Sequence, residues 1–215
     1  VALFVGSSLG GMSIFEKAHR RWTGVDAGPG LPINHPHPWQ AFYDGPTHQL
    51  GSQLKPSHGS WTVNTACSSA TNALGYARLW LLRNRIDIAI VVGLDAVSPF
   101  VYSGFHSLRA VDSNPTQPFG EQRRGLNLGE AAAAFVLIRG GENTQDCSQV
   151  VGFGSSCDTH HLTRPDPSGG GVARAINHAL TDARSTAGDI AAISAHGTGT
   201  PLNDPMEAAA FSQVF

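Results

Sequence analysis

The segment from residue 62 to residue 92 constrains the fold more than any other, because it indicates a strand, a helix and a second strand in succession. A β-type run at residues 62–66 precedes apolar residues at helical spacing, namely Ala70, Ala73, Leu74, Ala77 and Leu81. The nearly continuous apolar run 86–92 that follows is typical of a strand covered on both faces. Such a βαβ unit implies parallel pairing, so the sequence predicts an α/β fold.

Further elements are predicted on both sides of this unit. A second series comprises a β-type run, a polar loop, a helical pattern and another β-type run, at residues 150–154, 155–171, 172–186 and 190–195. Other strands are predicted at residues 1–5 and 131–138, and other helices at 13–22, at 47–55 and from Pro99 onward.

Cys67 lies at the predicted junction between a strand and a helix. Unpaired N–H groups and the positive end of the helix dipole favour a thiolate there, so we expect a thiol pKa below the free value of about 8.5. The small neighbours Ala66, Ser68 and Ser69 leave room for a substrate carbonyl and for an N–H that receives its oxyanion. The pattern indicates a nucleophile, while the alternative is a buried cysteine that packs as a small hydrophobe.

A rival nucleophile is Ser8, in the G-x-S-x-G pattern of residues 6–10. The pattern lies between a predicted strand and a predicted helix, as a hydrolase nucleophile elbow requires. A tight strand-to-helix connection explains the same residues.

His196 ends the predicted strand at residues 190–195. It is followed by glycines that permit close backbone approach and by the hydroxyls of Thr198 and Thr200. Ligands of open α/β sheets bind at the carboxyl ends of strands, where Cys67 is also expected. We therefore predict that Cys67 and His196 converge on one cleft.

Composition excludes several classes of protein. The 215 residues suit one ordinary domain or two small ones, and 41% hydrophobic residues can form a core. A net charge of -2 without a long Lys/Arg block predicts no nucleic-acid partner and no anionic membrane surface. No apolar run approaches the roughly 20 residues of a membrane span. Three cysteines do not resemble a disulfide framework, which favours a reduced, cytoplasmic setting.

Two histidine-containing segments have the composition of metal sites. Cys157, His160 and His161 stand so close in sequence that binding one ion would require a sharply folded loop. His35 and His37 lack a cysteine or carboxylate at ligand spacing. We therefore expect neither segment to bind a metal.

The chain begins at Val1 within a β-type run and stops at Phe215 within a helical pattern. We therefore expect it to be a segment of a longer protein.

Four motifs together resemble those of the β-ketoacyl-acyl-carrier-protein synthases, nearest to the elongating condensing enzymes of fatty acid and polyketide synthesis. They stand in the order and spacing of that family across nearly the whole chain. The motifs are Thr65-Ala-Cys-Ser-Ser-Ala70; Pro118-Phe119 with Arg123, Gly125, Gly129 and Glu130; Asp158 with His161, Thr163 and Pro165; and His196-Gly-Thr-Gly-Thr-Pro201 with Asp204 and Glu207.

The resemblance implies a thiolase-like fold, a layered αβαβα arrangement of two duplicated halves with mixed sheets. The first half would span residues 1–140 without the family's opening strand, and residues 149–215 would begin an incomplete second half. It also implies a homodimer or a heterodimer with a related ketosynthase subunit.

The resemblance also assigns roles to the site residues. Cys67 would take an acyl group from the phosphopantetheine thioester of an acyl carrier protein, and malonyl-carrier protein would lose carbon dioxide and attack it. His196 would stabilise the resulting enolate, Thr198 and Thr200 would hold the phosphopantetheine arm, and the Cys67 N–H would be one oxyanion donor. No metal or separate cofactor is implied. The family's second catalytic histidine would lie beyond Phe215, so we expect the segment alone not to turn over.

The chain departs from the family at four positions within these motifs. Gly120 and Arg124 stand where Asp is usual or common, Gln117 where Arg is common, and Ala131 where Gly often follows the glutamate. Three alternatives remain open at this point: a non-catalytic partner subunit, which usually replaces the nucleophile; thiolase chemistry on coenzyme A; and a serine hydrolase using Ser8 and His196.

Overall fold

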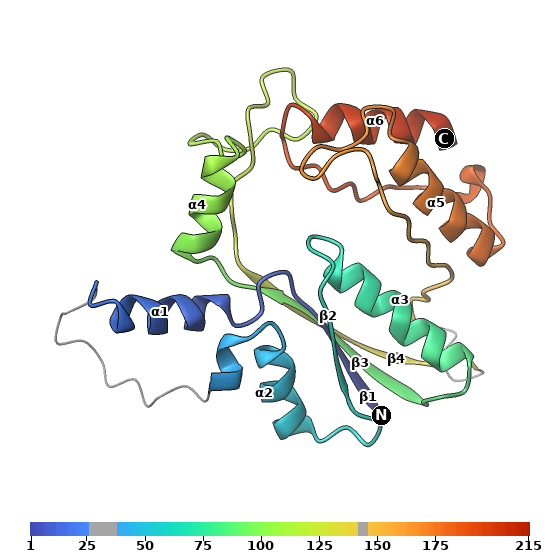
Figure 1. Cartoon of the computed structure of the whole chain (residues 1–215). Coiled ribbons are helices and arrows are strands. Elements are labelled where there is room, and N and C mark those ends of the chain that lie inside the picture. The colour runs from blue at the N-terminus through green and yellow to red at the C-terminus, as the bar shows by residue number, and fades with distance from the viewer. Residues whose placement is uncertain (26–37, 142–145) are drawn as a thin grey trace. The chain divides into compact units, whose positions relative to one another are not determined.

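The computed structural model describes residues 1–25, 38–141 and 146–215, which group into two compact units (Figure 1). The first unit contains Val1–Tyr102 and Gly129–Cys147, and the second contains Ser103–Leu128 and Ser148–Phe215. His35 and His37 lie outside the described residues. No helix in the described ranges is both long enough and apolar enough to cross a membrane.

The first unit is built on a four-stranded mixed sheet with the order β2-β1-β3-β4. Strand β1 (Ala2–Gly6) is parallel to β2 (Ser60–Val63) on one side and to β3 (Ile88–Asp95) on the other. Strand β4 (Ala131–Ile138) pairs antiparallel with β3. The predicted α/β fold with parallel pairing is confirmed in this unit.

Helices cover both faces of this sheet. Helix α3 (Ser69–Leu82) packs on β1, β2 and β3, where Ala73, Ala77 and Leu81 join the apolar core. On the opposite face, Thr62 of β2 donates a 2.7 Å hydrogen bond to Thr47 of α2 (Gly45–Leu54). Strand β1 is therefore buried on both faces, which explains its continuous apolar sequence.

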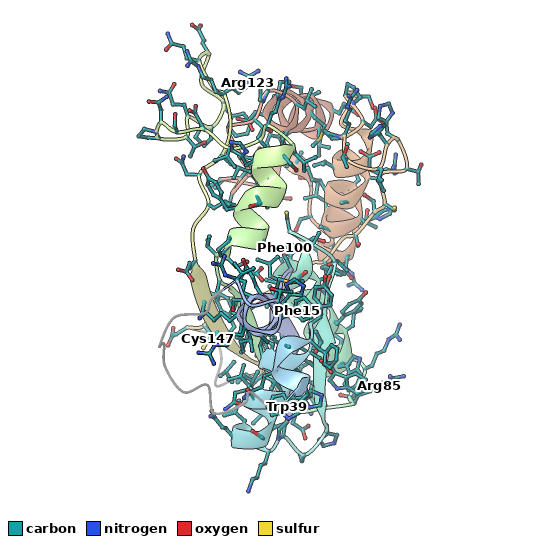
Figure 2. All side chains as sticks on the ribbon, turned by 60° about the vertical axis from the view of Figure 1, so that its left-hand side comes forward. Phe15, Trp39, Arg85, Phe100, Arg123 and Cys147 are labelled. Atoms are coloured by element: carbon teal, nitrogen blue, oxygen red, sulfur yellow. The ribbon has the colours of Figure 1, made fainter. Side chains whose placement is uncertain are left out.

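The remaining helical segments of the first unit follow β1. Helix α1 (Met12–Trp22) begins directly after the turn that leaves β1, and the short 3-10 helix η1 (Pro38–Ala41) precedes α2. Figure 2 marks Phe15 of α1 and Trp39 of η1, and the Trp39 ring packs against the ring of His48.

The strand predicted at residues 62–66 differs from the observed one. Strand β2 ends at Val63, because Ala66 adopts a left-handed φ of 53° and the Thr65 N–H bonds to the Ser69 side chain. Helix α3 then begins at Ser69, so Cys67 lies on the turn between strand and helix.

The second unit is formed by helices and irregular chain. Helix α5 (Gly170–Ala183) packs against α6 (Asn203–Val214), and the 3-10 helix η3 (Ala187–Asp189) lies between them in sequence. Helix α4 (Pro99–Ser107) starts in the first unit and ends in the second.

The strands predicted at residues 150–154 and 190–195 are wrong, since the structure has no strand in either segment. Both segments line an apolar groove of about 440 Å³ on α5 and α6. A Cβ atom on Gly154 would lie 2.0 Å from the Ala175 carbonyl oxygen, so this segment packs directly on α5. The predicted division into residues 1–140 and 149–215 stays a prediction.

Candidate active site

Cys67 is exposed on a strained turn at the start of α3. Ala66, directly before it, has a φ of 53°, a conformation that residues with a side chain rarely adopt. Helix α3 begins two residues later, so the thiol lies close to the positive end of that helix. The predicted placement of Cys67 at a strand-to-helix junction is confirmed, and the alternative of a buried cysteine is wrong.

The Ala66 carbonyl oxygen accepts three hydrogen bonds. The hydroxyl of Ser69 donates one at 2.6 Å, the N–H of Ser69 one at 3.0 Å, and the hydroxyl of Ser8 one at 2.9 Å. The preceding residue is held as well, since Asn72 donates to the Thr65 hydroxyl at 2.8 Å. These contacts fix the backbone on which the thiol is carried.

Glycines let the start of α3 approach the strands closely. A Cβ atom on Gly6 would lie 2.5 Å from the Ala70 backbone, and one on Gly93 would lie 2.8 Å from the Ala70 side chain. Gly6 ends β1 and Gly93 lies within β3, near its carboxyl end. The thiol turn is thus set against the carboxyl ends of the parallel strands, where an α/β sheet binds its ligands.

Asp95, at the end of β3, organises the turn that follows β1. Its carboxylate accepts the hydroxyl of Ser7 at 2.8 Å, the N–H of Ser8 at 3.0 and 3.1 Å, and the N–H of Leu9 at 3.0 Å. Sequence reasoning missed this residue. The available signal was an acidic residue that closes an otherwise apolar strand.

His196 begins a loop that is shaped by two glycines in the left-handed region. Gly197 has a φ of 54° and Gly199 a φ of 71°. A Cβ atom on Gly199 would lie 2.2 Å from the Thr116 hydroxyl, so only glycine fits there. The His196 side chain is exposed.

Two buried carboxylates of α6 hold this loop. Glu207 accepts the N–H groups of His196 and Gly197, at 2.7 and 2.8 Å. Asp204 accepts the N–H groups of Gly199 and Phe119, at 3.1 and 2.6 Å. Buried carboxylates require such donors to offset their lost hydration. The sequence motif contained both residues but did not show that they act on the backbone.

The hydroxyls of Thr198 and Thr200 lie 2.9 Å apart and form a hydrogen bond with each other. The N–H of Asn203 also donates to the Thr200 hydroxyl at 3.3 Å. The two threonines are partly buried, so they form one polar pair on the loop.

The structure brings the predicted residues together in two groups. Cys67 and Ser8 belong to the first unit, whereas His196, Thr198 and Thr200 belong to the second. The convergence of Cys67 and His196 stays a prediction.

The loop around Cys157 is held by its own polar groups. The Asp158 carboxylate accepts the N–H groups of Asp166 and His160, which lower the pKa of that carboxyl below its ordinary value. The ring of His161 accepts the Thr163 N–H at 3.0 Å. Across the ranges that the structure describes, no three His, Cys, Asp or Glu side chains are placed to hold a metal ion.

Known protein families match both parts of the chain. Residues 51–143 match the model of the β-ketoacyl synthase N-terminal domain, and residues 147–215 match that of the β-ketoacyl synthase C-terminal domain.

Curated relatives include 3-oxoacyl-acyl-carrier-protein synthase 2 of Staphylococcus aureus, which is 32% identical over 100% of this chain and 55% of its own length. The enzyme of the same name from Coxiella burnetii is 32% identical over 72% of this chain and 40% of its own length. The chain thus spans about half the length, or less, of these relatives.

Solved structures show the same fold. A ketosynthase in complex with its chain length factor, from Xenorhabdus doucetiae, has a TM-score of 0.87 and 31% identity, and the match covers 100% of this chain and 52% of that one. A β-ketoacyl synthase from Burkholderia phymatum has a TM-score of 0.84 and 26% identity, over 100% and 54% of the two chains. The chain therefore has a thiolase-like fold and belongs to the β-ketoacyl synthase family.

Proposed function

We propose that this chain carries the acyl-accepting thiol of a β-ketoacyl-acyl-carrier-protein synthase that acts in fatty acid or polyketide biosynthesis. The observation that carries the proposal is the exposed Cys67 on its strained turn at the start of α3, within the residues that match the N-terminal domain of the family.

In the first step the Cys67 thiolate attacks the carbonyl of an acyl thioester on a carrier protein. The new bond joins Sγ to the acyl carbon, and the carrier's thiolate leaves. A malonyl-carrier protein then loses carbon dioxide, and its enolate carbon attacks the Cys67 thioester. A carbon–carbon bond forms, the bond to Sγ breaks, and the product is a β-ketoacyl thioester.

In this proposal, residues of the second unit bind the malonyl thioester and stabilise the charge that develops on it. His196 donates a hydrogen bond to the malonyl thioester carbonyl as negative charge develops on it. Thr198 and Thr200 contact the phosphopantetheine arm. The contacts of Glu207 support these roles, because its carboxylate holds the loop by accepting the N–H of His196 and the N–H of Gly197.

The proposal extends to partners and setting. The substrates arrive on acyl carrier protein, and the chain needs no metal or cofactor of its own. The assembly is a homodimer or a heterodimer with a related ketosynthase subunit in the cytoplasm. The structure of a relative with its chain length factor supports such a pairing.

The alternatives receive less support. A non-catalytic subunit has no use for an exposed thiol on a strained turn. In the structure the Ser8 hydroxyl donates to the Ala66 carbonyl, so it is engaged by an acceptor that cannot serve as a general base. Carrier-protein enzymes among the relatives favour carrier thioesters over coenzyme A thioesters.

Peptide mapping after incubation with an acyl-carrier protein tests this proposal. We expect one acyl group on Cys67, released by neutral hydroxylamine, and no acylation of the Cys67→Ser variant. Cys157→Ser is the matched control, because Cys157 is also exposed, and it should be acylated like the wild type. Absence of acyl on Cys67, or acyl on Ser8, contradicts the proposal. Addition of malonyl-carrier protein should give no sustained β-ketoacyl product from the segment alone.

A further inference from the structure

The side chain of Ser8 links the turn after β1 to the residue directly before the thiol. Its hydroxyl donates to the Ala66 carbonyl at 2.9 Å, and its own carbonyl accepts the side-chain amide of Asn64 at 3.2 Å. The sequence pattern that suggested a serine nucleophile thus has a different role in the folded chain.

The geometry of one peptide unit gives this link its importance. The carbonyl of Ala66 and the N–H of Cys67 belong to the same planar group and point in opposite directions. Whatever fixes the direction of the Ala66 oxygen therefore also fixes the direction of the Cys67 N–H. A carbonyl that accepts hydrogen bonds also polarises its peptide unit, which makes the N–H a stronger donor.

This peptide unit needs outside support. The left-handed φ of 53° at Ala66 is strained for a residue with a side chain and persists only where the surroundings hold it. The two bonds from Ser69 come from the same turn and move with it. The bond from Ser8 comes from a separate segment, which Asp95 ties to the end of β3 through Ser7, Ser8 and Leu9.

We propose that Ser8 is a positioning residue for acyl transfer, whose hydroxyl orients and polarises the Cys67 N–H toward the thioester oxyanion. This inference rests on the proposed function. When Sγ bonds to the acyl carbon, the carbonyl π electrons move to oxygen, and the Cys67 N–H donates to that oxygen. Collapse restores the carbonyl and expels the carrier's thiolate. In this role Ser8 acts through the peptide unit.

Two reactions of the same thiol test this role. Acylation by an acyl-carrier protein passes through an oxyanion, whereas alkylation by iodoacetamide does not. In the 215-residue chain, Ser8→Ala should slow acylation of Cys67 about tenfold, less than the 10²–10³-fold that loss of a whole oxyanion donor costs. Its alkylation rate should match that of the wild type.

Two variants complete the series. Ser8→Thr keeps the hydroxyl and should retain most of the acylation rate. Ser52→Ala is the matched control, since Ser52 also donates to a backbone carbonyl, that of Gln49 at 2.8 Å, on the exposed surface of α2. It should leave both reactions unchanged.

A spectroscopic measurement tests the peptide unit without catalysis. Labelling only cysteine with ¹⁵N gives one amide signal each for Cys67, Cys147 and Cys157. Ser8→Ala should move the Cys67 signal upfield in ¹⁵N, because the preceding carbonyl loses a donor, and leave the other two in place. An unmoved Cys67 signal overturns the inference.

The kinetic outcomes separate the inference from the function on which it rests. Equal acylation of wild type and Ser8→Ala overturns the inference alone. An equal slowing of acylation and alkylation also overturns it, because the role is then general placement of the thiol. A wild-type chain that is not acylated on Cys67 contradicts the proposed function and the inference together.

Discussion

Arg123 has a buried donor without an acceptor in the part of the chain that the structure describes. Its Nε atom has no hydrogen-bond partner, while its Nη1 atom donates to the Gly120 carbonyl at 3.0 Å. Leaving a donor unpaired in this way costs about 1–3 kcal/mol. Position 120 is also where the family resemblance led us to expect an aspartate.

Gly120→Asp should therefore raise the free energy of unfolding by about 1 kcal/mol, because the new carboxylate accepts from the Arg123 guanidinium. The added Cβ meets Gln117 at 3.1 Å, so a small shift is needed. Urea denaturation measures the change. Gly120→Asn, which has the same shape without the charge, should gain less. A decrease for Gly120→Asp would contradict this account of the buried donor.

Single residues differ in how far the sequence predicts them. The position of Cys67 follows from local periodicity, because strand, turn and helix are adjacent in the chain. The roles of Ser8 and Asp95 depend on contacts across 58 and 87 residues of sequence. A single sequence contains no signal for such pairings, so Ser8 was interpreted from its motif alone.

At the scale of elements, Gly6 lets the start of α3 pack closely on the sheet beside the thiol turn. Gly6→Ala would place a methyl group 2.5 Å from the Ala70 backbone. The helix start must then move, which should lower the free energy of unfolding by about 1–3 kcal/mol and slow acylation of Cys67.

Gly104→Ala is the control for this variant. Gly104 lies in α4 and has no neighbour within 4 Å of an added Cβ atom. Replacing a helical glycine by alanine should there raise stability by about 0.5–1 kcal/mol. Thermal unfolding of both variants measures these changes. If Gly6→Ala left the stability unchanged, the packing of α3 on the sheet would not depend on this glycine.

The stability of the loop between Cys157 and α5 should depend on pH. N–H groups of Asp166 and His160 lower the pKa of Asp158 below 3.8. The ionised Asp158 carboxylate therefore stabilises the folded loop. This stabilisation is complete above pH 3.8 and is lost as the pH falls through the lowered pKa.

Hydrogen exchange of the Asp166 amide reports on this loop. Its protection should be constant above pH 3.8 and fall below that pH. In Asp158→Asn the side chain at position 158 cannot titrate, so protection of the Asp166 amide should lose the part of this fall that protonation of Asp158 causes. Identical profiles for the wild type and this variant would assign the pH dependence to another group.

Elements were predicted well where the signal is local. The helices after Pro99 and before Pro56, and the strand β4, follow from periodicity and turn residues. The predicted strands at 150–154 and 190–195 failed because a strand also needs a partner. Their apolar residues are explained instead by the groove on α5 and α6.

At the scale of the whole molecule, the chain passes repeatedly between the two units, since residues 103–128 belong with residues 148–215. Asp204 fastens these two segments together within the second unit. Its carboxylate is 1% exposed and accepts the N–H groups of Phe119 and Gly199 at 2.6 and 3.1 Å. Sequence motifs identified the residue, but the distant partner Phe119 became apparent only in the fold.

Asp204→Asn should destabilise the second unit alone. One of the two backbone N–H groups then faces the side-chain NH2 of the asparagine, which cannot accept, at a cost of about 1–3 kcal/mol. All four tryptophans lie in the first unit, at positions 22, 39, 61 and 80, whereas α5 and α6 contribute to circular dichroism. We expect the dichroism midpoint in urea to fall while the tryptophan fluorescence midpoint stays.

Two references are needed for this difference between the dichroism and fluorescence midpoints. They are the wild-type chain and Glu121→Gln, which alters an exposed carboxylate of the same unit. Coincident transitions are the mark of two-state unfolding, and divergent midpoints show that two units unfold separately. If both midpoints fell together in Asp204→Asn, the units would share one cooperative transition. The buried carboxylate would then support the folding of the whole chain, because loss of this acceptor in one unit would destabilise the sheet in the other.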